Sequence, residues 1–228
     1  MNLLCGSFAV VAALMYNDLT LAFWLIVAGI VFDFFDGFVA RLLHSSSAIG
    51  VQLDSLADVI TSGLAPAAVL WQVCLQTEPC WLPEAWKLGY GVFVLAAVSA
   101  LRLAKFNIDE TQTVEFCGLP TPAGSLLCAS LGMLWQQGML ALSSDGVLLI
   151  AVLTSLLLVS PIRMFALKFH GFGWRGNEVR YLFLLASIVL IIILRTYAIP
   201  VIIVLYIVVS AVRWLCMRSG NPDKAPKA

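Results

Sequence analysis

Charged residues are scarce in this sequence. Of its 228 residues only 11% are charged, whereas 61% are hydrophobic and the mean hydropathy is +0.98. An ordinary soluble domain carries about 25% charged residues, so the scarcity excludes that class. Basic and acidic residues also balance to a net charge of zero, which leaves no basic footprint for binding nucleic acid. We therefore expect a polytopic membrane protein whose main partner is the lipid bilayer.

Histidine and paired cysteines are scarce as well. Only two histidines occur, His44 and His170, so a histidine-rich metal site is not indicated. No two cysteines form a CxxC pair, so the usual zinc motifs are not indicated either. We interpret the six cysteines as small apolar residues within helices; only Cys74 and Cys80 are close enough in sequence to suggest a disulfide. The amino-terminal residues lack a basic region and a small-residue cleavage site, so we expect them to belong to the mature chain.

Long apolar runs, by contrast, are abundant. A membrane-spanning helix needs about 20 apolar residues, and on this criterion the sequence predicts an all-α protein with about eight transmembrane helices. No internal repeat or second domain is visible, so we expect a single domain over residues 1–228. The predicted helices lie near residues 3–15, 19–43, 50–75, 87–106, 122–141, 146–162, 178–197 and 200–217.

The first of these helices is unusually short. From Asn2 to Leu14 it would measure about 20 Å at the standard rise of an α-helix, whereas the hydrocarbon core of a bilayer is about 30 Å thick. The length indicates either a helix that starts deep in the membrane or a chain that lacks its natural beginning.

Basic residues are distributed unevenly between the predicted loops. If the loop after the second helix is cytoplasmic, only Lys87 and Arg195 lie outside. The positive-inside rule then places both termini in the cytoplasm of a multi-pass protein of the cell (inner) membrane. Eleven basic residues lie on the cytoplasmic side: Arg41, Arg102, Lys105, Arg163, Lys168, Arg175, Arg180, Arg213, Arg218, Lys224 and Lys227.

Four aspartates stand out in the segment DFFDGFVARLLHSSSAIGVQLDSLAD, residues 33–58. Asp33 and Asp36 share one face of the second predicted helix, and Asp54 and Asp58 share a face at the start of the third. A turn over residues 44–49 folds the two faces toward each other. Four carboxylates at a membrane surface repel one another unless a cation neutralises them.

A divalent cation accounts for this arrangement economically. Carboxylate oxygens favour Mg²⁺ or Mn²⁺, with Ca²⁺ as an option, over zinc, and four carboxylates suffice for two ions about 3.5–4 Å apart. Gly37 and Ala40 remove bulk beside the aspartates, and Arg41 offers a guanidinium suited to phosphate oxygens. The combination predicts a diphosphate site. The alternative is that the aspartates pair with Arg41 and Arg102 to hold helices together, but four at this spacing weigh against it.

The full pattern Asp33-x2-Asp36-Gly37-x2-Ala40-Arg41-x8-Gly50-x3-Asp54-x3-Asp58 resembles, without gap or substitution, the signature of the CDP-alcohol phosphatidyltransferases. The resemblance implies a six-helix core, usually dimeric, with two further carboxyl-terminal helices in this chain. It implies that Asp33, Asp36 and Asp54 hold the metals, and that Asp58 shares them and acts as general base. The residues implied to contact CDP-diacylglycerol are Asp33, Asp36, Gly37, Ala40, Arg41, Ser47 and Gly50.

Several further stretches are similar to the family members that use L-serine as acceptor. They are FDFFDGFVARLL, GVQLDSLADVITSGLAPA, SALRLAKFN and GLPTPA, within residues 2–125, and more weakly RGNEVRYLF at 175–183. The resemblance implies transfer of the phosphatidyl group of CDP-diacylglycerol to L-serine, which yields phosphatidylserine and CMP. A Pro-Asn-x-x-Thr-like segment that begins many members and contacts the nucleotide is missing.

A candidate acceptor site lies at the end of the fourth predicted helix. There Arg102 offers a guanidinium for a serine carboxylate, with Lys105 nearby, and Asn107 offers an amide oxygen for the ammonium. The alternative is that the two basic residues are ordinary anchors at the membrane surface.

Other functions are also compatible with parts of the pattern. A sibling transferase would use glycerol 3-phosphate or inositol, although a phosphorylated acceptor favours a denser basic cluster. A divalent-cation transporter would spread its carboxylates over broken helices near the membrane midplane, whereas these aspartates lie at helix ends beside glycine and arginine. A purely structural membrane scaffold is the remaining alternative.

Overall fold

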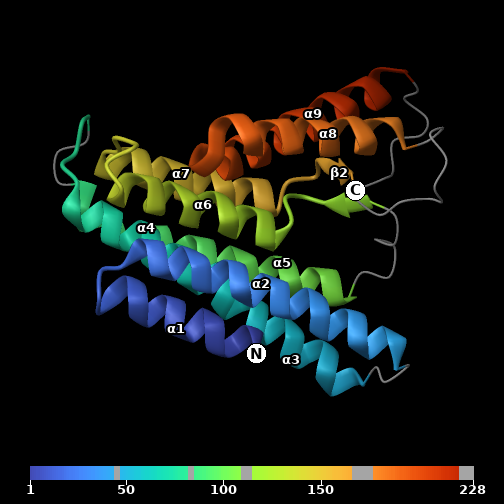
Figure 1. Cartoon of the computed structure of the whole chain (residues 1–228), viewed down its shortest axis with the longest axis horizontal. Coiled ribbons are helices and arrows are strands. Elements are labelled where there is room, and N and C mark those ends of the chain that lie inside the picture. Colours follow the sequence, from blue (N-terminus) through green and yellow to red (C-terminus); the bar gives the residue numbers. More distant parts are fainter. Residues whose placement is uncertain (44–46, 82–84, 109–114, 166–176, 221–228) are drawn as a thin grey trace.

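Helices account for nearly all of the described chain. The computed structural model describes residues 1–43, 47–81, 85–108, 115–165 and 177–220. Within these ranges the chain forms eight helical rods that lie roughly side by side (Figure 1). The first four rods are α1 (Asn2–Leu14), α2 (Leu19–Leu42), a continuous rod of α3 (Ala48–Asp58), η1 (Val59–Leu64) and α4 (Ala65–Gln76), and η2 (Ala85–Phe93) with α5 (Val94–Ile108).

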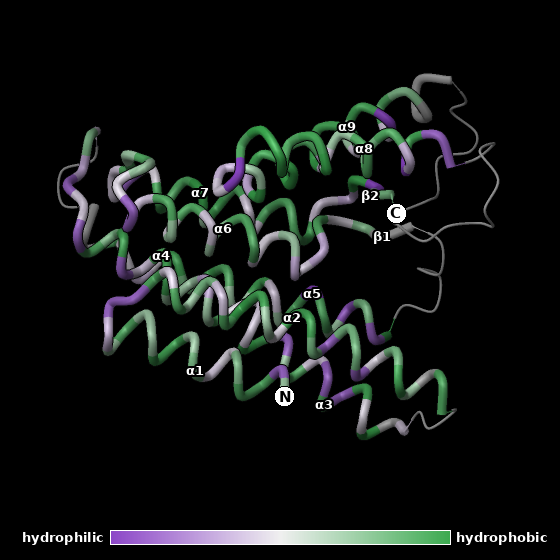
Figure 2. The backbone as a smooth tube through the Cα atoms, viewed as in Figure 1, coloured by the Kyte–Doolittle hydropathy of each residue, from purple (hydrophilic) through white to green (hydrophobic). Residues whose placement is uncertain are grey.

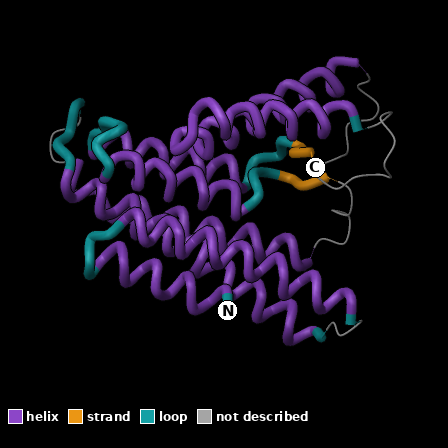
Figure 3. The backbone as a smooth tube through the Cα atoms, in the orientation of Figure 1, coloured by secondary structure: helices purple, strands orange, loops and turns teal. Residues whose placement is uncertain are grey.

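The remaining rods follow the same up-and-down course. They are α6 (Thr121–Gln136), α7 (Ser144–Leu158), α8 (Glu178–Leu194) and, after the short η3 (Arg195–Tyr197), α9 (Ala198–Gly220). Two three-residue strands, β1 (Glu115–Cys117) and β2 (Arg163–Phe165), pair antiparallel beside them (Figure 3).

The helical rods correspond one to one with the eight predicted helices, so the all-α membrane fold is confirmed. Four stretches of the described chain are long and apolar enough to cross a bilayer by length and composition alone. They are Leu19–Ala40, Ile49–Gln76, Leu88–Ile108 and Glu178–Cys216. The number of membrane crossings therefore stays a prediction.

The α4 helix forms the centre of the bundle. It contacts α1, α2, α6 and α7, and Ala65, Ala67 and Ala68 are completely buried. Small residues let the neighbouring backbones approach: a Cβ added at Gly132 of α6 would overlap the side chain of Val69. Close packing of small residues is the usual way in which helices associate in a membrane.

The helices are apolar along most of their length, as the predominantly green tube of Figure 2 shows, and many large apolar side chains are exposed. On α8, Leu182 is 66% exposed and Ile192 is 71% exposed. Exposed apolar side chains of this kind are stable when the surrounding solvent is lipid. A helix suits that solvent because all of its backbone hydrogen bonds are made within the helix. The surface therefore agrees with the membrane class predicted from composition.

The two ends of the bundle differ in charge. The end where α2 and α5 finish and α8 begins, on the right in Figure 1, carries most of the basic residues of the described chain. At the opposite end lie Lys87 of η2 and Arg195 of η3. Several residues that entered the sequence analysis lie outside the described residues: His44, Lys168, His170, Arg175, Lys224 and Lys227.

Neither Cys74 nor Cys80 forms a disulfide. Cys74 is buried and Cys80 is exposed, and all six cysteines are free thiols. The interpretation of the cysteines as small helix residues is therefore confirmed for Cys74 of α4, whereas Cys80 lies after the end of that helix. The end of the bundle near Cys80 is held instead by Asp145, which accepts hydrogen bonds from the backbone N–H groups of Cys80 and Trp81 at 3.1 and 2.8 Å.

Candidate active site

The centre of the site is one amide group between two carboxylates. The Nδ2 atom of Asn2, at the start of α1, donates to Oδ1 of Asp33 and to Oδ1 of Asp58, each at 2.9 Å. This contact is possible because α1 is short, so that its first residues lie partway along α2 rather than at its end (Figure 1). The side chain of Asn2 is 4% exposed, so the amide is fixed inside the protein.

A third aspartate approaches the same place. Asp54 lies one helical turn before Asp58 on α3, and its carboxyl group interacts with that of Asp33 across the interface with α2. The predicted convergence of the two aspartate pairs is therefore present for Asp33, Asp54 and Asp58. These residues meet because α2 and α3 run in opposite directions past one another (Figure 1); residues 44–46 of the predicted turn lie outside the described residues.

Asp36 lies at the margin of this group. It is 63% exposed, and its Oδ2 atom is 3.8 Å from the amino group of Met1. One turn of α2 separates it from Asp33, so the structure places it farther along the same face. Three of the four aspartates thus meet, whereas the fourth borders them.

The donor atoms of this group suit a divalent cation by their chemistry. Within the described residues, no group of three or more His, Cys, Asp or Glu side chains is arranged to hold a metal ion. The donors nevertheless fit a hard cation, because carboxylate and amide oxygens are its preferred ligands. The buried Oδ1 atom of Asn2 has no hydrogen-bond partner in the described parts of the chain, and this amide oxygen lies beside the carboxylates.

The predicted diphosphate side of α2 is open. A Cβ added at Gly37 would meet no described atom within 4 Å, and Ala40 on the same face is half-buried. Gly37 thus leaves room on this face of α2, and the predicted contact of Gly37 and Ala40 with a diphosphate stays a prediction. Arg41 lies in the last turn of α2, and its side chain is outside the described part of the structure.

Ser47 and Gly50 have a local structural role. The hydroxyl of Ser47 caps the start of α3 by accepting a hydrogen bond from the backbone N–H of Gly50 at 3.0 Å. A Cβ at Gly50 would lie 3.1 Å from that hydroxyl oxygen. Capping of this kind stabilises a helix start by about 1 kcal/mol. Both residues are exposed, and their predicted contact with a ligand stays a prediction.

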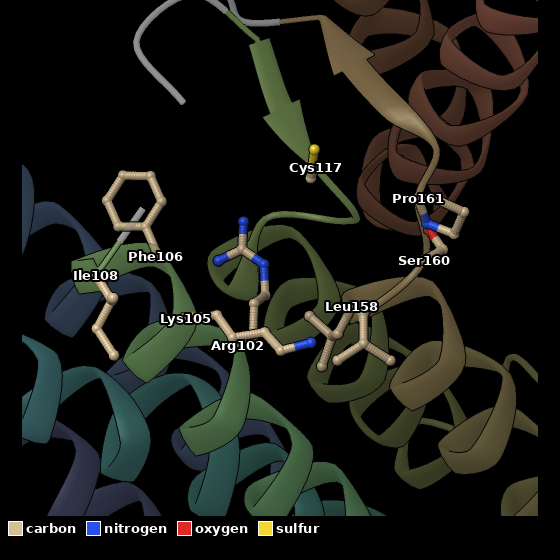
Figure 4. A pocket seen from close by; sticks show the side chains of 9 residues that line it. Arg102, Lys105, Phe106, Ile108, Cys117, Leu158, Ser160 and Pro161 are labelled. Carbon is tan, nitrogen blue, oxygen red and sulfur yellow. The ribbon is translucent and has the colours of Figure 1, made fainter. Parts of the chain in front are cut away.

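A cavity of about 400 Å³ opens near the aspartates, at the end of α5. Arg102 lines it with its guanidinium pointing into the space beside Cys117 (Figure 4). Arg102 is only 9% exposed, and its Nε atom has no hydrogen-bond partner among the described residues. Arg102 also interacts electrostatically with Asp58, so this residue links the cavity to the aspartates.

The predicted acceptor residues divide into two groups. Lys105 lines the cavity with Arg102, whereas Asn107 donates from Nδ2 to the hydroxyl of Ser55 on α3 at 2.8 Å. A surface anchor would extend its charged end into water. The burial of Arg102 therefore argues against an ordinary anchor and favours a binding role for this residue.

Asn2 is the site residue that sequence reasoning missed. The start of the chain lacks the proline and threonine of the family's Pro-Asn-x-x-Thr-like segment, so the motif as a whole is absent. An asparagine is nevertheless present at position 2, and this single residue was the signal that could have identified it. In the structure it contacts two of the motif aspartates.

Comparisons with known proteins agree with the motif. The sequence model of the CDP-alcohol phosphatidyltransferase family matches residues 1–160, so α8 and α9 lie beyond it. Among similar proteins is the CDP-diacylglycerol–serine O-phosphatidyltransferase of Bacillus subtilis, 33% identical over 170 residues, or 75% of this chain and 88% of the relative.

Two further relatives carry the same name. The protein of Helicobacter pylori strain 26695 is 30% identical over 200 residues, which cover 86% of this chain and 80% of the relative. That of Mycobacterium tuberculosis strain H37Rv is 33% identical over an aligned length of 241 residues, gaps included. The match covers 98% of this chain and 81% of the relative. With the motif, the site and the matched residues in agreement, the chain belongs to the CDP-alcohol phosphatidyltransferase family.

Proposed function

We propose that the protein transfers the phosphatidyl group of CDP-diacylglycerol to L-serine, yielding phosphatidylserine and CMP. The observation that carries the choice of acceptor is the buried guanidinium of Arg102, which has an unsatisfied Nε atom and faces a cavity beside the aspartates. A buried polar group that lacks a hydrogen-bond partner is costly, and the carboxylate of an amino acid is a suitable partner for the free N–H of this guanidinium. The shared name of the relatives supports the same acceptor.

Asp33, Asp36, Asp54 and Asp58 would hold the divalent cation or cations, Mg²⁺ or Mn²⁺, with Ca²⁺ as an option. When bound, such an ion draws negative charge from the diphosphate and stabilises the departing CMP. Asp36 borders the other three in the structure, which suits a carboxylate that meets the ligand from the open side. The open space at Gly37 supports entry of the nucleotide diphosphate from that side, with Ala40, Arg41, Ser47 and Gly50 along its path.

In this proposal Asp58 is the general base. It removes the proton from the serine hydroxyl, whose oxygen forms a bond to the lipid-bearing phosphorus, while the bond from that phosphorus to the CMP oxygen breaks. The Asn2 amide, 2.9 Å from Oδ1 of Asp58, orients the carboxylate so that its other oxygen is available to the hydroxyl. The nearby charge of Arg102 brings the acceptor to the same carboxylate.

The acceptor carboxylate binds Arg102, with Lys105 adding positive charge at the cavity. Asn107 is held against Ser55, one residue after Asp54, and would contact the acceptor ammonium through its amide oxygen. Among the residues that line the cavity, Arg102 and Lys105 are the cationic ones. This small cluster favours a carboxylate over the phosphate of glycerol 3-phosphate, and inositol has no carboxylate to accept from the guanidinium.

The proposal extends to location and assembly. The protein lies in the cell (inner) membrane as a homodimer, with both termini and the aspartates at the cytoplasmic side. The support for orientation is the concentration of basic residues at the aspartate end of the bundle.

An acceptor competition tests the function. Purified protein in detergent with CDP-diacylglycerol and Mn²⁺ is given L-serine, glycerol 3-phosphate or inositol separately, and release of CMP is measured. We expect release with serine alone, and phosphatidylserine as the lipid product. Equal or faster release with either other acceptor contradicts the assignment of serine.

A further inference from the structure

The helix that carries Asp54 and Asp58 widens immediately after Asp58. Residues Val59–Leu64 form a π-helix, in which the N–H of Ala65 donates to the carbonyl of Ile60, five residues earlier. Pro66 explains the change, because its ring would clash with the carbonyl of Ser62 in a regular α-helix and it has no N–H to donate. Short π-helical segments are frequent at functional sites.

Thr61 lies in the middle of this segment and is completely buried. Its side chain occupies the space that side chains at two glycines would need: a Cβ at Gly29 of α2 would lie 2.7 Å from Cγ2 of Thr61, and a Cβ at Gly6 of α1 would overlap Thr61 itself. The wide turn thus pushes Thr61 between α1 and α2. These are the helices that carry Asn2 and Asp33.

Hydrogen bonds connect Thr61 to the centre of the site. The Thr61 hydroxyl donates to the backbone carbonyl of Asn2 at 3.1 Å. The side-chain amide of the same asparagine donates to Asp33 and to Asp58, at 2.9 Å each. One residue, Asn2, is therefore held by its backbone on one side and supports two carboxylates with its side chain on the other.

We propose that Thr61 is a positioning residue, whose hydroxyl fixes Asn2 so that the asparagine amide holds Asp33 and Asp58 in the arrangement that binds cation and substrate. The inference rests on the proposed function, because that function assigns Asp33 and Asp58 their roles in binding cation and substrate. The π-helix is what brings the hydroxyl there, because it turns the chain after Asp58 so that Thr61 faces α1. Its effect on the reaction is indirect, since Thr61 acts through Asn2.

A purely structural role makes a different prediction. If Thr61 only fills space between the glycines, its methyl group matters and its hydroxyl does not. Two comparisons separate these contributions. The first compares the wild type with Thr61→Val, which keeps the shape of the side chain and removes the hydroxyl. The second compares Thr61→Ser with Thr61→Ala: both variants lack the methyl group, and only the serine variant has the hydroxyl.

Cation binding is measured without the reaction. The melting temperature of each purified variant in detergent is followed against Mn²⁺ concentration, because a ligand that binds the native state raises it. Loss of one hydrogen bond corresponds to about a fivefold change in binding. We expect Thr61→Val and Thr61→Ala to raise the half-saturating Mn²⁺ concentration about fivefold or more, and Thr61→Ser to stay within about twofold of the wild type.

Ser125→Ala is the matched control. The Ser125 hydroxyl donates to the backbone carbonyl of Thr61 at 3.4 Å, so this variant removes a buried hydrogen bond from the same residue but leaves the contact with Asn2 intact. We expect its half-saturating Mn²⁺ concentration to stay within about twofold of the wild type. A shift as large as that of Thr61→Val overturns the proposed path through Asn2.

A double-mutant cycle tests that path directly. In an Asn2→Ala background the side-chain amide is gone, so we expect Thr61→Val to produce no additional shift in Mn²⁺ binding. Additive effects of the two substitutions contradict the proposal. Equal behaviour of Thr61→Ser and Thr61→Ala also contradicts it, and this comparison remains available if the valine variant does not fold.

CMP release separates this inference from the proposed function. If the wild type releases no CMP with serine, the proposed function fails, while the Mn²⁺ measurements still decide the role of Thr61. If the wild type is active, Thr61→Val is expected to raise the KM for CDP-diacylglycerol about fivefold and leave the KM for serine within about twofold. An unchanged KM for CDP-diacylglycerol in Thr61→Val overturns the inference even where the function holds.

Discussion

At the scale of single residues, the four motif aspartates differ in their surroundings. Asp33 and Asp58 are half-buried and share the amide of Asn2, whereas Asp36 is largely exposed beside the amino terminus. The motif spacing places all four on two facing helices but does not distinguish them. Their environments indicate separate contributions, which substitution by the isosteric asparagine can measure one at a time.

Replacing Asp58 with asparagine tests the assignment of the general base. A neutral amide at this position cannot accept the serine proton, so we expect kcat to fall by about 100-fold or more. CDP-diacylglycerol binding, measured by equilibrium dialysis, should be retained better in Asp58→Asn than in the control Asp33→Asn, which removes a proposed metal ligand. Turnover close to that of the wild type in Asp58→Asn would remove this residue from the mechanism.

Replacing Arg102 with alanine tests the acceptor site. A charge-assisted hydrogen bond contributes about 1.5–3 kcal/mol, so we expect Arg102→Ala to raise the KM for serine roughly 10- to 100-fold. The KM for CDP-diacylglycerol should stay within a few fold. The control is Lys105→Ala, which removes an exposed cation from the same cavity and should have a smaller effect.

Two other results for Arg102→Ala carry distinct meanings. If both KM values rise together, Arg102 belongs to the diphosphate site instead. If neither changes, the serine pocket lies elsewhere, and the segment from Arg163 to Arg180 is the next place to examine.

At the scale of elements, glycines set how closely the helices of the site approach one another. Gly6 of α1 lies against the backbone and side chain of Thr61, whereas Gly37 of α2 faces open space. One glycine therefore serves packing, and the other leaves room for a ligand. Sequence alone shows two glycines in apolar helices and does not separate these uses.

Alanine substitution at the two glycines is expected to have opposite consequences. Gly6→Ala forces α1 away from η1, and overpacking of this kind typically costs about 1–3 kcal/mol, so the melting temperature in detergent should fall together with activity. Gly37→Ala should leave the melting temperature unchanged and raise the KM for CDP-diacylglycerol. Loss of stability in Gly37→Ala, or none in Gly6→Ala, contradicts this division.

At the scale of the whole molecule, the distribution of basic residues predicts one orientation in the membrane. We expect Ser46 and the tail after Arg218 to be cytoplasmic and Pro83 to lie outside. Single cysteines at these positions are introduced into a variant without its native cysteines and treated with a membrane-impermeant thiol reagent. The cysteine at position 83 should react in intact cells, whereas those at position 46 and in the tail should react only after lysis. Labelling of residue 46 from outside would reverse the orientation.

Much of the fold could be predicted from the sequence because its signals are local. Apolar runs of the length of a bilayer predict helical rods, since a backbone in lipid must satisfy its own hydrogen bonds. The spacing of Asp33 and Asp36, and of Asp54 and Asp58, fixes shared helix faces through the 3.6-residue period. Membership of the family follows from that same spacing and is confirmed by the match over residues 1–160.

The tertiary structure decided what depends on contacts between distant parts of the chain. Asn2 meets Asp58 across 56 residues of sequence, and the burial of Arg102 requires packing that no local pattern encodes. It also divided the predicted acceptor residues, turning Asn107 toward Ser55 and leaving Arg102 and Lys105 at the cavity. Residue type and spacing determine which groups a helix face presents, whereas the depth at which a short helix such as α1 docks determines which of those groups meet.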